Sequence, residues 1–431
     1  MSKFKFIMAA DPQYPWTLKD DKDHSMGTSG SWHGKNPIAE SYGNDADKLA
    51  EMQVASINAL IKTESTSDSP IKGVMFNGDL VNYNNWTGAY STTHLAHFKD
   101  NYGKISVPIY CGLGNHDYDM NVDDTLENRG ATSMVEYIID NCSENGIANC
   151  DYRKMEDYTF PSLRTVYTGS FSYSFDIENV HFVQLHNYPG YTRSWGNFRG
   201  DRAREVDVNV TDCFDWLEED LRIARSAGKA IIIAHHYCGD NYKRYVELFN
   251  KYKVSAVFIG HLHASYGKSV ISGSTIPLFY CGSTSQSNYI LMEADDDKVM
   301  VRGISSINGK CDFIDNAVET FELVTVAEEN EAGNPAGYVN LFSEGGYTVE
   351  FTLKYILNGR QCTINTGRML LGNKKTYDLP AGASNYEISC RAWNGSKWKS
   401  PFFTDDSDTP FNCTYKTYGV LPNPKMKVIK D

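Results

Sequence analysis

The sequence predicts an α/β fold followed by a small all-β domain. Up to about residue 270, short apolar runs that indicate buried strands alternate with segments of helical periodicity. After residue 337 the pattern changes to alternating apolar and polar residues between Gly, Asn and Pro turns, which is typical of a β-sandwich. A chain of 431 residues is also too long for one ordinary core, so two domains are expected.

The boundary between the two domains is predicted at residues 327–337. This segment, AEENEAGNPAG, is acidic and rich in Gly, Ala and Pro, as linkers are. We therefore expect a catalytic domain at residues 1–326 and a β-sandwich at residues 338–431. Strict alternation within the second domain predicts two half-buried strands, at residues 347–355 and 386–392.

Three strands are predicted early in the chain, at residues 4–10, 71–76 and 107–113. A helix between the first two begins at Asn44 or Asp45, because either side chain can cap it. Its apolar face consists of side chains at helical spacing: Ala46, Ala50, Val54, Ile57 and Ile61.

The same alternation continues in the second half of the catalytic domain. Helices are predicted at residues 212–228 and 241–253, and strands at residues 230–234 and 255–259. Residues 117–180 carry many Asn, Asp, Tyr and Gly and show little periodicity. We expect this segment to form substrate loops or surface insertions.

The net charge of the chain limits the kinds of molecule that it is expected to bind. The chain has 54 acidic and 41 basic residues and a formal net charge of −13, which disfavours specific binding of nucleic acid. The first residues, MSKFKFIMAADPQ, run directly into a strand and leave no room for a signal peptide. A cytoplasmic location is therefore expected, or secretion if a leader precedes these residues. Cys142 and Cys150 lie eight apart, which leaves a disulfide between them open.

Five short polar blocks follow predicted strands. Carboxylate, amide and imidazole groups are the ligands that divalent metal ions take, and the ends of parallel strands meet at one edge of a sheet. Two neighbouring ions need a bridging carboxylate between them, and Asp79 is the lone Asp after a Gly at a strand end. The blocks are Asp11-Pro12-Gln13, Gly78-Asp79, Gly114-Asn115-His116-Asp117, His235-His236 and Gly260-His261-Leu262-His263.

With all five blocks present in order, residues 4–270 resemble the calcineurin-like metallophosphoesterase superfamily. The resemblance implies a four-layer α/β/β/α sandwich and a metal-bridging hydroxide that attacks phosphorus. It also implies that His116 acts as general acid, with Asp117 placed to orient it. The implied ligands are Asp11, Gln13, Asp79 and His263 for one ion, and Asp79, Asn115, His235 and His261 for the other.

Gln13 departs from the commonest pattern of this superfamily, in which the first block is Asp-x-His. An amide oxygen is a harder ligand than imidazole, which favours manganese or magnesium over zinc. Two divalent ions are therefore expected, with manganese preferred and magnesium, iron or zinc as alternatives. Asp-x-Gln also resembles branches such as Mn-dependent ADP-ribose/CDP-alcohol pyrophosphatases.

Several other polar residues have a structural interpretation at least as strong as a functional one. His236 is as well explained by a structural role as by a functional one, and His186 by a capped strand end. His94 and His97 lie three apart on a predicted helix and are expected at the surface. The only basic cluster near the catalytic half of the sequence is expected in a solvated loop, although one of its arginines would suit binding of a substrate phosphate. The cluster consists of Arg193, Arg199, Arg202 and Arg204.

The C-terminal domain shows a looser likeness. The segments at residues 345–351 and 415–425 resemble the β-sandwich membrane-recognition domain of thiol-activated cytolysins. The stretch at residues 391–398 matches the Trp-rich loop of that domain with two tryptophans, Trp393 and Trp398, but without its cysteine. The resemblance implies contact with a membrane or a glycan, and a plain packing domain is the alternative.

Together these features predict hydrolysis of a phosphate monoester or diester in a small molecule, lipid or protein. The competing hypothesis is a binding protein that retains the metal site while the β-sandwich recognises membrane or glycan. His116 favours the enzyme, because a purely structural metal site does not need an acid beside it.

Overall fold

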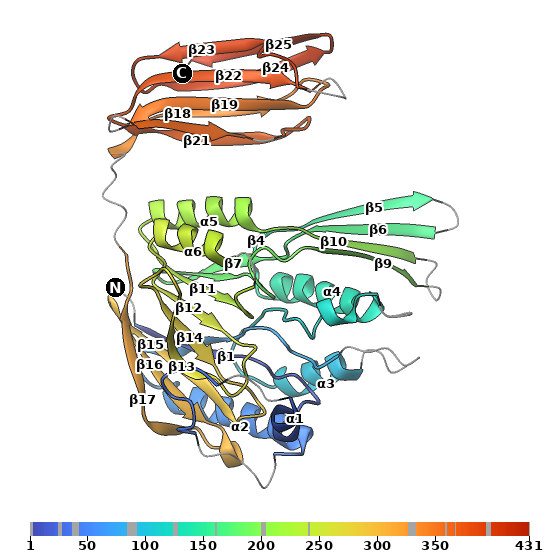
Figure 1. The fold of residues 1–431 in the computed structure, drawn as a ribbon, viewed down its shortest axis with the longest axis vertical. Coiled ribbons are helices and arrows are strands. Elements are labelled where there is room, and N and C mark those ends of the chain that lie inside the picture. The colour runs from blue at the N-terminus through green and yellow to red at the C-terminus, as the bar shows by residue number, and fades with distance from the viewer. Residues whose placement is uncertain are drawn as a thin grey trace. The chain divides into compact units, whose positions relative to one another are not determined.

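The chain forms two compact units in the computed structural model, Met1–Val326 and Ala327–Asp431. Figure 1 shows the fold with its elements labelled. The structure describes residues 3–430 except 25–27, 37–42, 84–92, 124–127, 160–161, 200–203, 240–241, 326–332, 358–359, 367 and 394–397. Much of the predicted linker, 327–337, lies outside the described residues. Strand β18 begins at Gly333, so residues 333–337 are strand rather than linker.

The first unit is built on two sheets. The six-stranded sheet has the order β17-β16-β15-β1-β2-β3, in which β1, β2 and β3 are parallel. Its strands are β1 Phe4–Ala9, β2 Ile71–Phe76, β3 Ile109–Cys111, β15 Asn288–Asp295, β16 Lys298–Ser305 and β17 Asp312–Glu322.

The second sheet has seven strands in the order β13-β14-β12-β11-β8-β7-β4, and its central strands β8, β11, β12 and β14 are parallel. Its strands are β4 Asn149–Cys150, β7 Tyr173–Ile177, β8 Val180–Gln184, β11 Ala230–His235, β12 Ala256–Ile259, β13 Tyr266–Val270 and β14 Pro277–Cys281.

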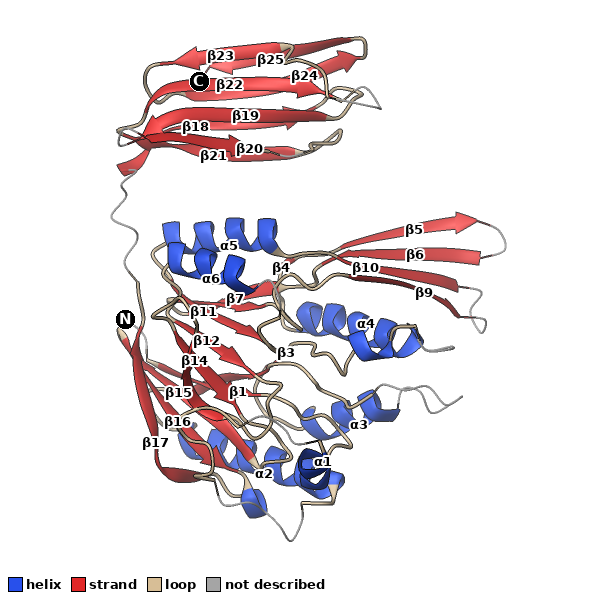
Figure 2. Ribbon diagram, in the orientation of Figure 1, coloured by secondary structure: helices blue, strands red, loops and turns tan. Residues whose placement is uncertain are grey.

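Helices cover the outer faces of the two sheets (Figure 2). Helices α2 Ala46–Glu64 and α3 Thr93–Tyr102 flank the six-stranded sheet, and α5 Phe214–Ser226 and α6 Tyr242–Lys251 flank the seven-stranded one. The Asp45 side chain caps α2 by accepting a hydrogen bond from the Lys48 N–H, as predicted. Aromatic side chains fill the space between the sheets, where Phe6 stacks on Phe182 with ring centroids 4.7 Å apart. The predicted four-layer α/β/β/α arrangement is confirmed.

The prediction that residues 117–180 form loops is wrong for much of this segment. This segment contains helix α4 Asn128–Glu144 and strands of a separate four-stranded sheet of order β5-β6-β10-β9. The sheet packs on α4, where the Trp195 Nε1–H donates to Thr132 Oγ1 at 3.0 Å. Strand β5 is exposed along most of its length, so it lacks the apolar alternation that identifies a strand. The bounds are β5 Arg153–Thr159, β6 Ser162–Gly169, β9 Arg193–Arg199 and β10 Arg204–Val210.

The second unit consists of two four-stranded sheets that enclose an apolar core. Their orders are β21-β18-β24-β25 and β20-β19-β22-β23. Inward side chains from both sheets form the core, among them Val339, Phe351, Ile388 and Tyr415. The predicted all-β C-terminal domain is confirmed. Its strands are β18 Gly333–Ser343, β19 Val349–Leu357, β20 Arg360–Asn365, β21 Lys374–Ala381, β22 Ser384–Ala392, β23 Phe403–Ser407, β24 Asn412–Val420 and β25 Asn423–Lys430.

The structure also bears on the possible disulfide and on membrane-spanning helices. Cys142 and Cys150 are free thiols in the structure. None of the helices in the described part of the chain combines the length and the apolar character that a bilayer crossing requires.

Candidate metal centre

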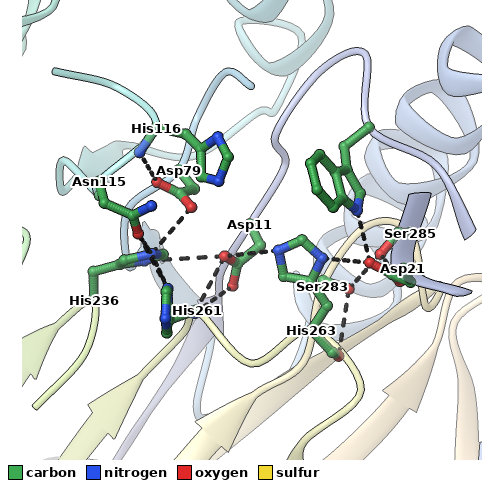
Figure 3. Close-up of polar contacts among 12 residues, drawn as sticks. Asp11, Asp21, Asp79, Asn115, His116, His236, His261, His263, Ser283 and Ser285 are labelled. Atoms are coloured by element: carbon green, nitrogen blue, oxygen red, sulfur yellow. Dashed lines mark hydrogen bonds and ion pairs between the residues drawn. The ribbon is translucent and has the colours of Figure 1, made fainter. Parts of the chain in front are cut away.

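Loops from both sheets of the first unit meet at the carboxyl ends of their parallel strands. Asp11 follows β1, Asp79 follows β2 and Asn115 follows β3, while His236 follows β11 and His261 follows β12. Figure 3 shows Asp11 between His236 and His261 on one side and His263 on the other. Residues far apart in the sequence therefore meet because five strands end at the same place.

The backbone of this site is held in an unusual conformation. Asp11, Gln13, Asp79 and His261 have φ values of 50°, 38°, 49° and 69°. A non-glycine residue in such a region costs about 1–3 kcal/mol and persists only where the surroundings enforce it. Hydrogen bonds between the loops supply that constraint, for example from the Gln13 N–H to the Asp79 carbonyl at 2.8 Å. Strain concentrated on four neighbouring residues indicates a functional site.

Two glycines allow the loops to approach closely. A Cβ on Gly114 would lie 2.2 Å from Asp79 Oδ1, and one on Gly260 would lie 2.6 Å from Asp11 Oδ2. Any side chain at either position would displace a carboxylate. The glycines in the sequence blocks thus make room for the acidic groups.

The first group of ligand atoms consists of Asp11, Asp79 and His263, whose atoms lie within 4.8 Å of one another. His263 Nε2 is 3.4 Å from Asp11 Oδ1. Burial disfavours the charged imidazolium of His263, but the carboxylates of Asp11 and Asp21 outweigh this effect and raise its pKa to about 10.

The second group consists of Asp79, His236 and His261. His236 Nε2 is 3.1 Å from Asp79 Oδ2 and 3.1 Å from Asn115 Oδ1, and His261 Nδ1 is also 3.1 Å from Asn115 Oδ1. Burial opposes the charge on His236, yet Asp79 raises its pKa to about 9. Burial and the neighbouring His236 lower the pKa of His261 to about 3. Asp79 therefore belongs to both groups, as the sequence predicted for a bridging carboxylate.

The lack of hydrogen-bond partners for the Gln13 side chain, within the residues that the structure describes, supports Gln13 as a metal ligand. Its side-chain amide is buried, and neither its nitrogen nor its oxygen has a hydrogen-bond partner among the described residues. A buried amide without a partner costs free energy unless something else binds it. The carboxylate, amide and imidazole groups at this site are a donor set that divalent ions accept, so the residues fit the implied metal pair.

The prediction that His235 reaches this site is wrong, and His236 takes its place. His235 Nε2 lies 3.1 Å from the Tyr242 hydroxyl, on the side of α6. Side chains alternate along a strand, and Ile231 and Ile233 pack toward the helices while Ile232 packs between the sheets. His235 continues the first series, and the next residue therefore faces the site.

The His116 ring is oriented by a main-chain carbonyl. His116 Nδ1 donates to the Asn82 carbonyl at 2.8 Å, and its main-chain N–H donates to Asp79 Oδ1 at 2.8 Å. The prediction that Asp117 orients this ring is wrong. The buried Asp117 carboxylate instead accepts hydrogen bonds from the N–H groups of Leu80, Val81 and Gly114, at 3.1, 3.0 and 2.8 Å. Asp117 therefore ties together the loops after β2 and β3.

The weaker candidates have structural roles. His186 is buried, accepts from the Leu113 N–H at 3.0 Å and contacts the Phe171 carbonyl at 2.6 Å. His94 bonds the Tyr83 carbonyl, and His97 stacks on Tyr14.

Nothing at Arg193 indicates a phosphate clamp, since its guanidinium pairs with Asp123 at 2.7 Å. Arg202 lies outside the described residues, and so do the side chains of Arg199 and Arg204.

Asp21 and Trp16 are residues that the sequence analysis missed. Asp21 accepts a hydrogen bond from His263 Nδ1 at 2.5 Å, and Trp16 donates its Nε1–H to Asp21 at 2.7 Å. Both residues lie in the polar stretch after the first block, where no periodicity marks a buried position. Their closeness to Gln13 in the sequence was the only signal for these two residues, and closeness alone does not identify a functional side chain.

Comparison with known proteins identifies the family. The family model named calcineurin-like phosphoesterase matches residues 31–265, which is more than half of the chain. The chain belongs to this family. The phosphoesterase is therefore a metal-dependent phosphoric ester hydrolase, and this expectation from the sequence is confirmed. Asp11 and Gln13 precede the matched segment.

Solved structures give more distant likenesses to the phosphoesterase. A dimetal phosphatase from Danio rerio is 13% identical, with 75% of this chain and 99% of that chain covered and a TM-score of 0.43. The membrane-binding domain of pneumolysin is 12% identical over 22% of this chain and 96% of its own, with a TM-score of 0.19. Listeriolysin O is 13% identical over 33% of this chain and 38% of its own, with a TM-score of 0.19. No curated protein sequence matches the chain.

Proposed function

We propose that the unit Met1–Val326 hydrolyses phosphate monoesters or diesters with two divalent metal ions. The observation that carries this proposal is the sharing of Asp79 by two groups of ligand atoms. Two cations at short distance repel each other, and a shared carboxylate offsets that repulsion. A phosphorylated small molecule, lipid or protein is the expected class of substrate.

The proposed ligands follow the two groups. Asp79 is shared by the two ions. The other proposed ligands of one ion are Asp11, His263 and the Gln13 amide. Those of the other ion are His236, His261 and the Asn115 amide. When bound, the ions supply a nucleophile at neutral pH by acidifying water, and they offset the negative charge of the phosphate. The amide and carboxylate oxygens favour Mn²⁺ or Mg²⁺ over Zn²⁺, and Mn²⁺ is the proposed cofactor.

His116 is the proposed general acid. Because its Nδ1–H donates to the Asn82 carbonyl, Nε2 is the nitrogen that exchanges a proton with the leaving oxygen. The hydrogen bond from its main-chain N–H to Asp79 fixes the acid relative to the shared carboxylate. Asp117 supports both residues by holding the loops that carry them.

The test is an assay of the full chain, stripped of metal, with an aryl phosphomonoester and an aryl phosphodiester. We expect turnover that returns on addition of Mn²⁺ and is lost in D79N. H116Q should lower kcat by about 10²–10⁴-fold without reducing the number of ions bound, because it removes a proton donor and no ligand. Metal binding without turnover would support the competing hypothesis of a binding protein. Full activity in D79N would contradict the proposed ligands.

A second proposal concerns membrane contact by the β-sandwich unit. Leu370, Leu371 and Val420 are 53%, 66% and 66% exposed. Adjacent loops bring them to one end of the sandwich, since Met369 bridges to Val349 and the Gly346 N–H donates to the Gly419 carbonyl.

Two tryptophans lie at the same end of the sandwich. The Trp393 N–H donates to the Thr348 carbonyl, next to Val349, and the rings of Trp393 and Trp398 meet edge-on at 5.4 Å. Exposed aliphatic groups beside tryptophans suit the interface of a bilayer better than a glycan. These loops support the proposal that this end of the unit contacts a lipid surface.

The test is flotation of the full chain with phospholipid vesicles. We expect association that is lost when Leu370 and Leu371 are both replaced by Asp. The matched control replaces both Ile223 and Val270 by Asp, which adds the same two charges at apolar residues of the other unit that are 53% and 82% exposed, and it should leave association unchanged. Absence of wild-type association, or equal association of both variants, would overturn the proposal, and binding to a glycan array instead would favour the glycan alternative.

A further inference from the structure

Asp21 lies on the opposite side of His263 from Asp11 (Figure 3). It belongs to the short helix α1 Leu18–Asp23 and is only 5% exposed. Its carboxylate oxygens accept hydrogen bonds from four side chains. The donors are Trp16 Nε1 at 2.7 Å, His263 Nδ1 at 2.5 Å, Ser285 Oγ at 2.6 Å and Gln286 Nε2 at 2.6 Å.

The contact with His263 determines which nitrogen faces the candidate metal centre. A carboxylate accepts, so His263 carries its hydrogen on Nδ1 and directs Nε2 toward Asp11 Oδ1, 3.4 Å away. Pairing of a ligand histidine with a buried carboxylate fixes the orientation of the ring and makes its free nitrogen a better donor to a metal ion. Asp21 is in place to do both.

The contact with Trp16 links the same carboxylate to His116. The indole ring meets His263 edge-on at 5.5 Å and 85°, and it meets His116 at 5.6 Å and 69°. His116 also meets Tyr83 at 5.2 Å and 64°. Because the indole N–H is bonded to Asp21, the contact of this ring with both histidines depends on Asp21.

We propose that Asp21 is a positioning residue that orients His263 as a metal ligand and holds Trp16 against His263 and His116. This inference rests on the proposed two-metal centre. It predicts that loss of the Asp21 carboxylate weakens one metal site, the one formed with Asp11 and His263, and leaves the site formed with His236 and His261 intact. A role confined to anchoring α1 would change stability and leave both affinities unchanged.

The test is titration of the metal-free full chain with Mn²⁺ by isothermal calorimetry. Wild type should bind two ions, and D21N should bind one of them about 10–100-fold more weakly, the usual effect of removing the partner of a ligand histidine. The matched control is D23N, which removes the same charge from the exposed end of the same helix and should bind both ions as wild type does. A weakened site in D23N as well would overturn the inference, because the loss would then be a general charge effect.

Two further outcomes separate this inference from the proposed function. Failure of wild type to bind two Mn²⁺ ions would contradict the metal centre itself. Two ions bound with unchanged affinity by D21N would agree with the proposed metal centre but would overturn the positioning role of Asp21. If D21N does not fold, D21E is measured in its place, since it keeps the charge but moves the carboxylate by one methylene. The same weakening of one site is expected, and unchanged affinities would overturn the inference.

Discussion

The buried His181 should make the stability of the catalytic unit depend on pH in the alkaline range. His181 lies in β8 between two carboxylates, with Nδ1 2.8 Å from Asp176 Oδ1 and Nε2 2.9 Å from Asp220 Oδ2. Burial disfavours its charge, but the hydrogen bonds to Asp176 and Asp220 outweigh this and raise its pKa from 6.5 to about 9. The imidazolium is therefore favoured in the folded state.

The magnitude follows from the difference between the folded and unfolded pKa values. Each unit is worth about 1.4 kcal/mol, so the shift corresponds to about 3 kcal/mol of stability, as an order of magnitude. Because the folded pKa is the higher one, this stability is fully present below the unfolded pKa of 6.5 and is lost as the pH rises through about 9. The free energy that H181Q loses relative to wild type should thus be larger at about pH 6 than at about pH 10.

The assay is urea unfolding of the full chain, followed in the transition of the catalytic unit at about pH 6 and about pH 10. Taking the difference between wild type and H181Q at each pH removes the contribution of other titrating groups. H33Q, at an exposed histidine, serves as the control for the effect of a histidine-to-glutamine change itself. A difference for H181Q that does not change with pH would contradict the raised pKa of His181 in the folded state.

Two more predictions concern the geometry of the metal centre. H236N should abolish Mn²⁺-dependent turnover, whereas H235N, at the adjacent position, should retain it, because His235 bonds Tyr242 and not the ligand groups; equal loss in both variants, measured by steady-state kinetics, would contradict this assignment. G114A should lower kcat/KM by about 100-fold or more, since its Cβ would displace Asp79 and a misplacement near 1 Å has about that effect. The control G146A, whose Cβ meets nothing within 4 Å, should keep its activity, and an active G114A would show that the loop has room.

The sequence was most informative where strands end. The apolar runs before Asp11, Asp79 and Asn115 predicted both the sheet and the convergence of these side chains, because parallel strands direct their carboxyl ends to one edge. The glycine before Asp79 is needed for the close approach of the loops, since a Cβ on Gly78 would lie 2.8 Å from the Gly114 nitrogen and 2.8 Å from His236 Nδ1.

The choice between His235 and His236 was beyond the sequence for a physical reason. Strand β11 is buried on both faces, so its residues before His235 are all apolar, and no alternation shows which side of the strand faces the site. Asp117 was misassigned because its nearest neighbour in sequence, His116, is not its partner in space. Asp21 was missed because its partners, His263 and Ser285, lie more than 240 residues away.

In the proposed metal centre one carboxylate, Asp79, joins the two metal ions. The most direct test is to count the manganese bound per chain by mass spectrometry after dialysis, in wild type and in D79N. We expect two ions per chain in wild type and none in D79N, because each group of ligand atoms includes Asp79. One ion or none in wild type, or two ions retained by D79N, would contradict it.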